Sequence, residues 1–222
     1  MKRILICCKN NFFKEKIKKK NFFFISKKKE LNLSFLKKLN PYIIFFPHWS
    51  YLVDKMIVKN FLCIGFHSTP LPYGRGGSPI QNMIIRGHKK TKICALKLDE
   101  GFDTGKIFIK KNVTLNGSGK EIFIRIYNKI IPMIMQLSNK LPKQKNQVGK
   151  IVFFKRRKAI QSQIIKIKNL NRLYDFIRML DINEKNFPNA YLKNDFFHFA
   201  ITNVRKLSNK LIGKVTIKKI SS

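Results

Sequence analysis

Residues 62–76 have the sequence Leu-Cys-Ile-Gly-Phe-His-Ser-Thr-Pro-Leu-Pro-Tyr-Gly-Arg-Gly, and this stretch decides the fold expected for the chain. The run 62–66 is apolar throughout, as in a strand buried on both faces of a parallel sheet. His67 ends the run, and the prolines and glycines that follow favour a rigid loop. Ligands of open parallel sheets bind beyond the carboxyl ends of the strands. The stretch therefore predicts a strand that delivers a histidine to a binding crevice.

Apolar runs alternate with amphipathic stretches on both sides of this segment, which is the pattern of strands alternating with helices. Strands are expected at 3–7, 22–25, 42–46, 91–98 and 107–115, and helices at 31–39, 52–61, 79–87 and 119–139. Ser118 and Glu121 have the spacing of a capping box that starts the last helix. The order predicts the α/β class: a Rossmann-like parallel sheet with helices on both faces, plus a small C-terminal domain.

The composition also indicates where one domain ends and the next begins. Residues 141–150 are polar and contain Pro142 and Gly149, so we expect a linker there. It would join a catalytic domain at 1–140 to a small C-terminal domain at 151–222. The sequence leaves open whether the chain is a monomer or a homodimer.

The chain carries a formal charge of +36, with 38 lysines but only 9 arginines. One interpretation is a polyanionic partner such as tRNA or a nucleotide-linked substrate. The other is a compositional bias of an A/T-rich genome, because arginine is the residue that phosphate and base recognition favours. No apolar run is long enough to span a bilayer, and no secretory signal is recognisable. We therefore expect a cytoplasmic protein that makes no membrane contact.

His67 is followed after thirty-six positions by Asp103-Thr-Gly105. An aspartate held in a turn near a strand-end histidine could accept its N–H bond and stabilise the imidazolium form. The alternative is a structural histidine bonded to backbone. The four cysteines and four histidines show no paired metal-site spacing, so no metal is expected.

These motifs resemble the signature of the folate-dependent formyltransferases, His-x-Ser-x-Leu-Pro-x-x-Arg-Gly followed by Asp-x-Gly. Members of this family include methionyl-tRNA and sugar N-formyltransferases. The resemblance covers residues 41–134, and it continues more faintly into Ile177–Asp181 and Phe187–Ala190. The matching positions are His67, Thr69 (where Ser is usual), Leu71, Pro72, Arg75, Gly76, Asp103 and Gly105.

The resemblance implies transfer of a formyl group from 10-formyltetrahydrofolate to a primary amine. His67 would polarise the developing oxyanion or shuttle a proton, and Asp103 would orient His67 and take up the proton of the amine. The loop before Asp103 would bind the pterin, through Leu98, Asp99, Glu100, Gly101 and Phe102.

One position departs from the family pattern. Gly65 stands where the family usually has an asparagine that donates to the oxyanion, and loss of one such donor typically costs about 10²–10³ in rate. The protein would then be inactive, or another side chain would substitute, or a backbone N–H near His67 aided by its protonated ring would serve. Weaker candidates for contacts with the acceptor substrate are His48, Ser50, Arg75, Gln81 and Asn82.

The identity of the acceptor amine rests on weaker signals. The Pro-Leu-Pro-Tyr-Gly-Arg-Gly loop and the short N-terminal part favour a nucleotide-linked or sialic-acid-like amino sugar of surface polysaccharide biosynthesis. The alternative is methionyl-tRNA in translation initiation, which suits the charge and the basic segment 155–158. Glycinamide ribonucleotide fits less well because of the C-terminal segment. A hypothesis from another class is a non-catalytic RNA-binding protein on a decayed enzyme scaffold.

Overall fold

The computed structural model describes residues 1–182 and 188–220. It divides into two compact units: residues 1–76, 92–113 and 125–153, and residues 77–91, 114–124 and 154–222. Phe187, which belongs to the fainter resemblance, lies outside the described residues. The predicted division into domains at 1–140 and 151–222 stays a prediction, and each compact unit is described below by itself.

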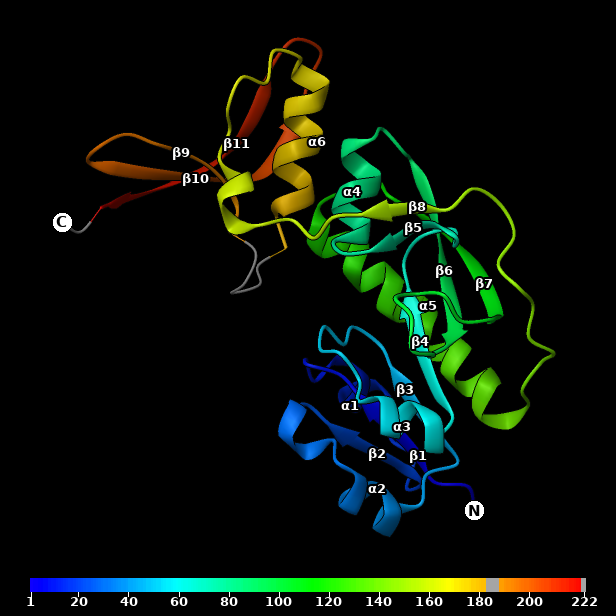
Figure 1. The fold of residues 1–222 in the computed structure, drawn as a ribbon. Helices are drawn as coiled ribbons and strands as arrows, with labels where there is room; N and C mark the ends of the chain where they lie inside the picture. Colours follow the sequence, from blue (N-terminus) through cyan, green and yellow to red (C-terminus); the bar gives the residue numbers. More distant parts are fainter. Residues whose placement is uncertain (183–187, 221–222) are drawn as a thin grey trace. The chain divides into compact units, whose positions relative to one another are not determined.

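A six-stranded sheet, in the order β2-β1-β3-β4-β6-β7, forms the frame of the first unit (Figure 1). Its strands are β1 (Ile4–Cys7), β2 (Phe22–Ile25), β3 (Ile43–Phe46), β4 (Cys63–His67), β6 (Lys90–Lys97) and β7 (Ile107–Thr114). The first four strands pair in parallel. The next pair, β4 with β6, is antiparallel. The predicted α/β class with a Rossmann-like sheet is confirmed, and the sheet is mostly parallel, with an antiparallel pair at β4 and β6.

The helices that accompany this sheet are short, apart from the last. They are α1 (Phe12–Lys16), the 3-10 turn η1 (Lys28–Glu30), α2 (Leu33–Leu39), α3 (Lys55–Asn60) and α5 (Gly119–Asn139). Asn32 and Asp54 cap α2 and α3 through their side chains, which satisfies backbone N–H groups that a helix start leaves unpaired. The predicted capping box also forms, because Glu121 accepts from the backbone N–H of Ser118 and the Ser118 hydroxyl accepts in return.

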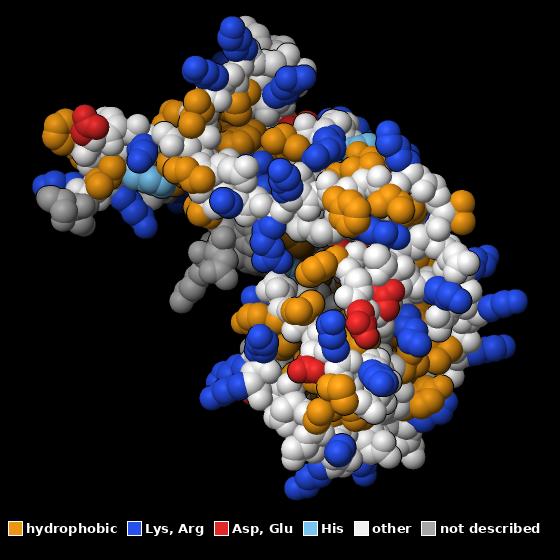
Figure 2. Space-filling view, viewed as in Figure 1, with side chains coloured by type: hydrophobic (Ala, Val, Ile, Leu, Met, Phe, Trp, Pro, Cys, Tyr) orange, Lys and Arg blue, Asp and Glu red, His pale blue; other side chains and the backbone are white. Residues whose placement is uncertain are grey.

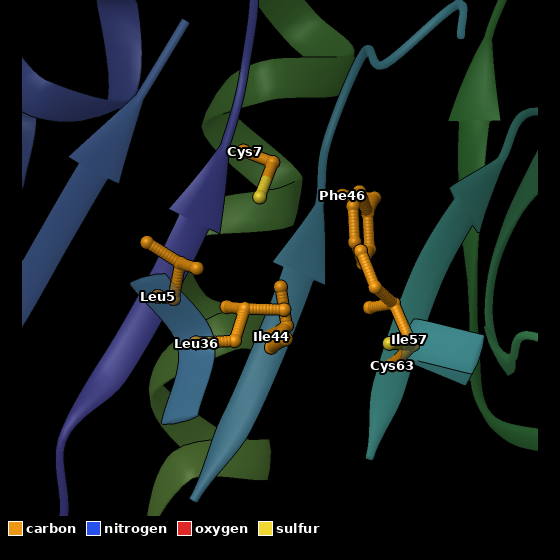
Figure 3. Close-up of a cluster of buried hydrophobic side chains, with 7 residues drawn as sticks. All are labelled: Leu5, Cys7, Leu36, Ile44, Phe46, Ile57 and Cys63. Atoms are coloured by element: carbon orange, nitrogen blue, oxygen red, sulfur yellow. The ribbon is translucent and has the colours of Figure 1, made fainter. Parts of the chain in front are cut away.

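The core of the first unit lies between the strands and these helices. Figure 3 shows one buried cluster with Leu36 of α2 and Ile57 of α3 set against side chains of β1, β3 and β4. Phe13 of α1 instead packs against Tyr127 of α5, with ring centroids 5.5 Å apart. Helices therefore cover both faces of the sheet, as the sequence predicts, and the carboxyl ends of β3 and β4 are left to the loops that follow them.

The loop predicted at 68–78 contains a short strand, β5 (Tyr73–Gly76), which pairs with β8 (Val152–Phe154). The second unit contains α4 (Pro79–Ile85), the 3-10 turn η2 (Ala159–Ser162) and α6 (Leu170–Leu180). It also has a three-stranded antiparallel sheet of β9 (Ala190–Lys193), β10 (Phe197–Lys206) and β11 (Leu211–Lys219). Helix α6 packs against β10.

Candidate active site

His67 is the last residue of β4, and its side chain is buried against the loop that follows. Its Nδ1 lies 3.3 Å from Oδ2 of Asp103, and its Nε2 lies 2.7 Å from the carbonyl oxygen of Gly74. A carbonyl oxygen and a carboxylate oxygen can only accept hydrogen bonds. The two ring nitrogens therefore both face acceptor oxygens. This arrangement suits a group that gives and takes protons.

Asp103 sits in an unusual backbone conformation that aims its carboxylate at His67. Its φ is 56°, in the left-handed region that aspartate tolerates better than most residues. The same Oδ2 atom accepts a 2.9 Å bond from the backbone N–H of Gly76. Gly105 is required nearby, because a Cβ at this position would lie 1.7 Å from the carbonyl oxygen of Lys97. The Asp-x-Gly motif thus follows from the path of the chain.

The predicted pterin loop is held largely by its own side chains. Asp99 accepts bonds from the Gly101 N–H and from the Thr104 hydroxyl, so its carboxylate shapes the loop. Glu100 makes an exposed ion pair with Lys55. Phe102 is 69% exposed although it is a large aromatic residue. The loop therefore presents an uncovered apolar ring directly before Asp103.

Gly65 is the position that departs from the family pattern. The side chain of Leu98 occupies the space that a side chain at position 65 would need. A Cβ at this position would lie 2.7 Å from Cδ2 of Leu98, which is closer than real Cβ contacts allow. Leu98 in turn packs against the apolar cluster of Figure 3. The absence of a side chain at position 65 is thus matched by a bulky one at position 98.

The guanidinium group of Arg75 is hydrogen-bonded within the protein. Its Nε and Nη2 donate to Oε1 of Gln147, at 3.2 and 2.8 Å. The side-chain amide of Gln147 donates in turn to the backbone carbonyls of Asp103 and Gly105, at 2.7 and 2.9 Å. Sequence reasoning missed Gln147, because it lies in the polar stretch expected to be a linker and no local pattern there indicates a partner.

Four predicted substrate-binding residues remain, and the structure shows the environment of each. His48 has a φ of 53° and its ring lies edge-on to Tyr127, with centroids 5.5 Å apart. Ser50 is exposed. Gln81 and Asn82 belong to the second unit, where Gln81 is 1% exposed and the Asn82 amide donates to three backbone carbonyls. The Asn82 amide thus holds the backbone around α4, and the substrate roles of all four residues stay predictions.

No group of three or more potential metal-binding side chains occurs among residues 1–182 and 188–220. Within the same residues, none of the helices has the length and apolar character needed to cross a membrane.

Comparison with known proteins identifies relatives of both parts of the chain. The family model described as formyl transferase matches residues 9–123. The model described as methionyl-tRNA formyltransferase, C-terminal domain, matches residues 159–218. The solved structure of a methionyl-tRNA formyltransferase from Clostridium thermocellum is similar at a TM-score of 0.88, with 39% identity. That match covers 99% of this chain and 100% of the other.

Two further relatives are informative. The methionyl-tRNA formyltransferase of Rickettsia prowazekii (strain Madrid E) is 34% identical over 85 residues, which cover 37% of this chain and only 28% of the rickettsial protein. The chain thus aligns with less than a third of that curated relative. A sugar N-formyltransferase from Shewanella sp FDAARGOS_354 has a TM-score of 0.65 and 18% identity, over 88% of this chain and 94% of the other. That level of identity shows a shared fold alone.

These comparisons correct one prediction. The expectation of an amino-sugar acceptor is wrong, because the full-length match at 39% identity and the C-terminal family model both point to methionyl-tRNA formyltransferases. The loop at 70–76 and the short N-terminal part, which favoured a sugar, occur in a chain whose whole length aligns with such an enzyme. The alternative acceptor, methionyl-tRNA, is the better supported one.

Proposed function

The chain belongs to the formyl transferase family, and we propose that it transfers the formyl group of 10-formyltetrahydrofolate to the amino group of methionyl-tRNA. The observation that carries this proposal is the alignment of the entire chain, C-terminal part included, with a methionyl-tRNA formyltransferase. Such an acceptor would place the reaction in the cytoplasm, where translation begins.

In the proposed reaction the amine attacks the formyl carbon, a new C–N bond forms, and the bond from that carbon to N10 of the folate breaks. The amine loses a proton and N10 gains one. The His67–Asp103 pair, whose Nδ1 and Oδ2 atoms lie 3.3 Å apart, is suited to deliver one proton and accept the other. A positioned acid–base group of this kind typically contributes about 10²–10⁴ in rate.

The developing oxyanion needs a donor, and Gly65 has no side chain to supply one. We assign this role to the protonated ring of His67. For this to happen Nε2 must leave the Gly74 carbonyl, to which it bonds at 2.7 Å. A small displacement of the loop 70–76 would expose that nitrogen to the formyl oxygen.

The pterin of the donor is apolar on its faces and carries hydrogen-bonding edges. We propose that Leu98 and the exposed Phe102 ring contact its faces, and that backbone groups of residues 99–101 bind its edges. The uncovered ring of Phe102 and the apolar surroundings of Leu98 fit such a ligand. Asp99 and Glu100 already have partners of their own, so they would contribute backbone rather than carboxylate contacts.

The experiment that tests this function measures tetrahydrofolate release by the purified protein, with 10-formyltetrahydrofolate and a panel of acceptors. Methionyl-tRNA should support release, whereas free methionine and uncharged tRNA should not. Release with methionyl-tRNA no faster than without an acceptor would overturn the proposal. Tight binding of tRNA without any release would instead favour the non-catalytic RNA-binding hypothesis.

A further inference from the structure

Gln147 occupies a position between the two loops that carry the candidate active site. One loop, residues 68–76, follows His67, and the other, residues 98–105, contains Asp103. The Gln147 side chain bonds to both: its Oε1 accepts from the guanidinium of Arg75, and its Nε2 donates to the Asp103 and Gly105 carbonyls. All four hydrogen bonds lie within the first compact unit. The Gln147 side chain thus uses its oxygen as an acceptor and its nitrogen as a donor at the same time.

The two carbonyls that Gln147 binds flank the strained part of the Asp103 loop. Asp103 has a φ of 56°, and residues in that region persist only when their surroundings hold them there. Nε2 of Gln147 donates to the carbonyls of the residues before and after Thr104. These two bonds hold the peptide groups that set the direction of the Asp103 side chain. In addition to these bonds from Gln147, the Asp103 carboxylate itself accepts a hydrogen bond from the Gly76 N–H.

Gln147 is itself held in place by backbone. Two residues before it, Lys145 exchanges a pair of backbone hydrogen bonds with Ile107, at 2.8 and 2.9 Å. Ile107 begins β7. The segment expected to be a linker is thus anchored to the central sheet at this point, and this anchor brings the Gln147 side chain to the Asp103 loop.

We propose that Gln147 is a positioning residue for formyl transfer, which holds Asp103 in line with His67 and ties Arg75 to the same unit. This inference rests on the proposed function. It goes beyond it by assigning a role in the reaction to a residue outside the His–Asp motif. Gln147 touches neither His67 nor the Asp103 carboxylate, so it acts through the loop backbone.

The test compares Gln147→Met, which keeps the size of the side chain and loses all four bonds, with Gln147→Glu. The glutamate variant keeps an acceptor for Arg75 but has no donor for the two carbonyls. Both should lower kcat by about 10–100-fold, the scale of a small misplacement of a catalytic group. The KM for 10-formyltetrahydrofolate should change by less than about threefold. Gln136→Met, the same change at an exposed site on α5, is the matched control and should leave both constants unchanged.

A second readout does not need activity. The ¹⁵N chemical shifts of the His67 ring report the hydrogen bond of Nδ1, and they should move in both Gln147 variants but not in Gln136→Met. Normal kcat with unchanged shifts in Gln147→Met would overturn the proposal, as would a loss of kcat matched by global unfolding in circular dichroism. If the wild-type protein shows no transfer, the proposed function fails, whereas the shifts still decide whether Gln147 positions Asp103.

Discussion

Gly65 and Leu98 compete for one space in this site. The space that an asparagine would occupy at position 65 contains Cδ2 of Leu98, 2.7 Å from where its Cβ would stand. Nothing local to β4 signals this coupling, because the two residues are thirty-three positions apart. The sequence indicates the missing donor, and only the structure shows what replaces its volume.

The coupling gives a direct prediction for stability. Gly65→Asn alone should lower the free energy of unfolding by about 1–3 kcal/mol, the usual cost of overpacking a filled core. Adding Leu98→Ala should recover most of that loss, although Leu98→Ala by itself also destabilises. Denaturant unfolding of the three variants measures this double-mutant cycle, and simple additivity of the two losses would show that the residues do not share the space.

The buried thiols carry a second prediction at this scale. Burial raises the pKa of Cys63 to about 12, with Lys97 acting in the opposite direction, and burial also raises the pKa of Cys7 and Cys94. Few of these thiols are thiolates at pH 8, and the thiolate is the reactive form. Alkylation by iodoacetamide should therefore be slow in the native protein and complete after unfolding; rapid labelling of the folded chain would contradict this.

The same pKa shift sets a pH dependence. Because an unperturbed cysteine ionises near pH 9.0 and Cys63 at about 12, the folded state holds the thiol proton more tightly than the unfolded chain does. The stability from this difference is fully present below pH 9 and is lost as the pH rises toward 12. Denaturant midpoints measured across this range should fall for the wild type and fall less for Cys63→Ala.

At the scale of elements, the sequence predicts which helices and strands form better than it predicts how the strands pair. The strand at 22–25 and the start of the long helix after Ser118 are as expected, because an apolar run marks the strand and a capping box marks the helix. The antiparallel direction of β6 could not be predicted, since it depends on how the chain returns after α4 rather than on any local pattern. The short pairing of β5 with β8 and the position of Gln147 escape prediction for the same reason, as both join segments more than seventy residues apart.

Helix α6 depends on one buried cation. Arg178 is 4% exposed, pairs with Asp175 and donates to the carbonyls of Leu115 and Gly117. Arg178→Met should lower the free energy of unfolding by about 3–5 kcal/mol, because it removes the buried cation that pairs with Asp175 and leaves two carbonyls without their donor. Lys89→Ala, which removes only an exposed contact to Asp175, should cost less than about 1 kcal/mol. Equal effects in thermal or denaturant unfolding would refute this ranking.

For the whole molecule, the sequence left the use of the +36 charge open between a polyanionic partner and compositional bias. Figure 2 shows lysine and arginine side chains spread widely over the visible face, with few acidic ones among them. This distribution fits both interpretations, because a composition bias spreads charge evenly and a large nucleic acid could use much of it. The proposed methionyl-tRNA acceptor gives the charge a partner that salt can test.

If tRNA is the partner, its binding should depend steeply on ionic strength. A protein that neutralises six to ten phosphates loses about 10³–10⁵ in affinity between roughly 50 and 200 mM salt. We expect a loss of about 10³-fold for methionyl-tRNA in filter binding or fluorescence anisotropy. A loss below about tenfold would mean that the basic surface makes few phosphate contacts and that the charge reflects composition.

The measurement that tests the central claim most directly follows an isotope-labelled formyl group from 10-formyltetrahydrofolate into methionyl-tRNA. The wild-type protein should transfer the label, and Glu15→Gln, which changes an exposed acid of α1 outside the site, should transfer it equally well. Asp103→Asn should lose about 10²–10⁴ in rate, because it removes the carboxylate that faces His67 and can take up a proton. Transfer at the wild-type rate by Asp103→Asn would contradict the assignment of the His67–Asp103 pair.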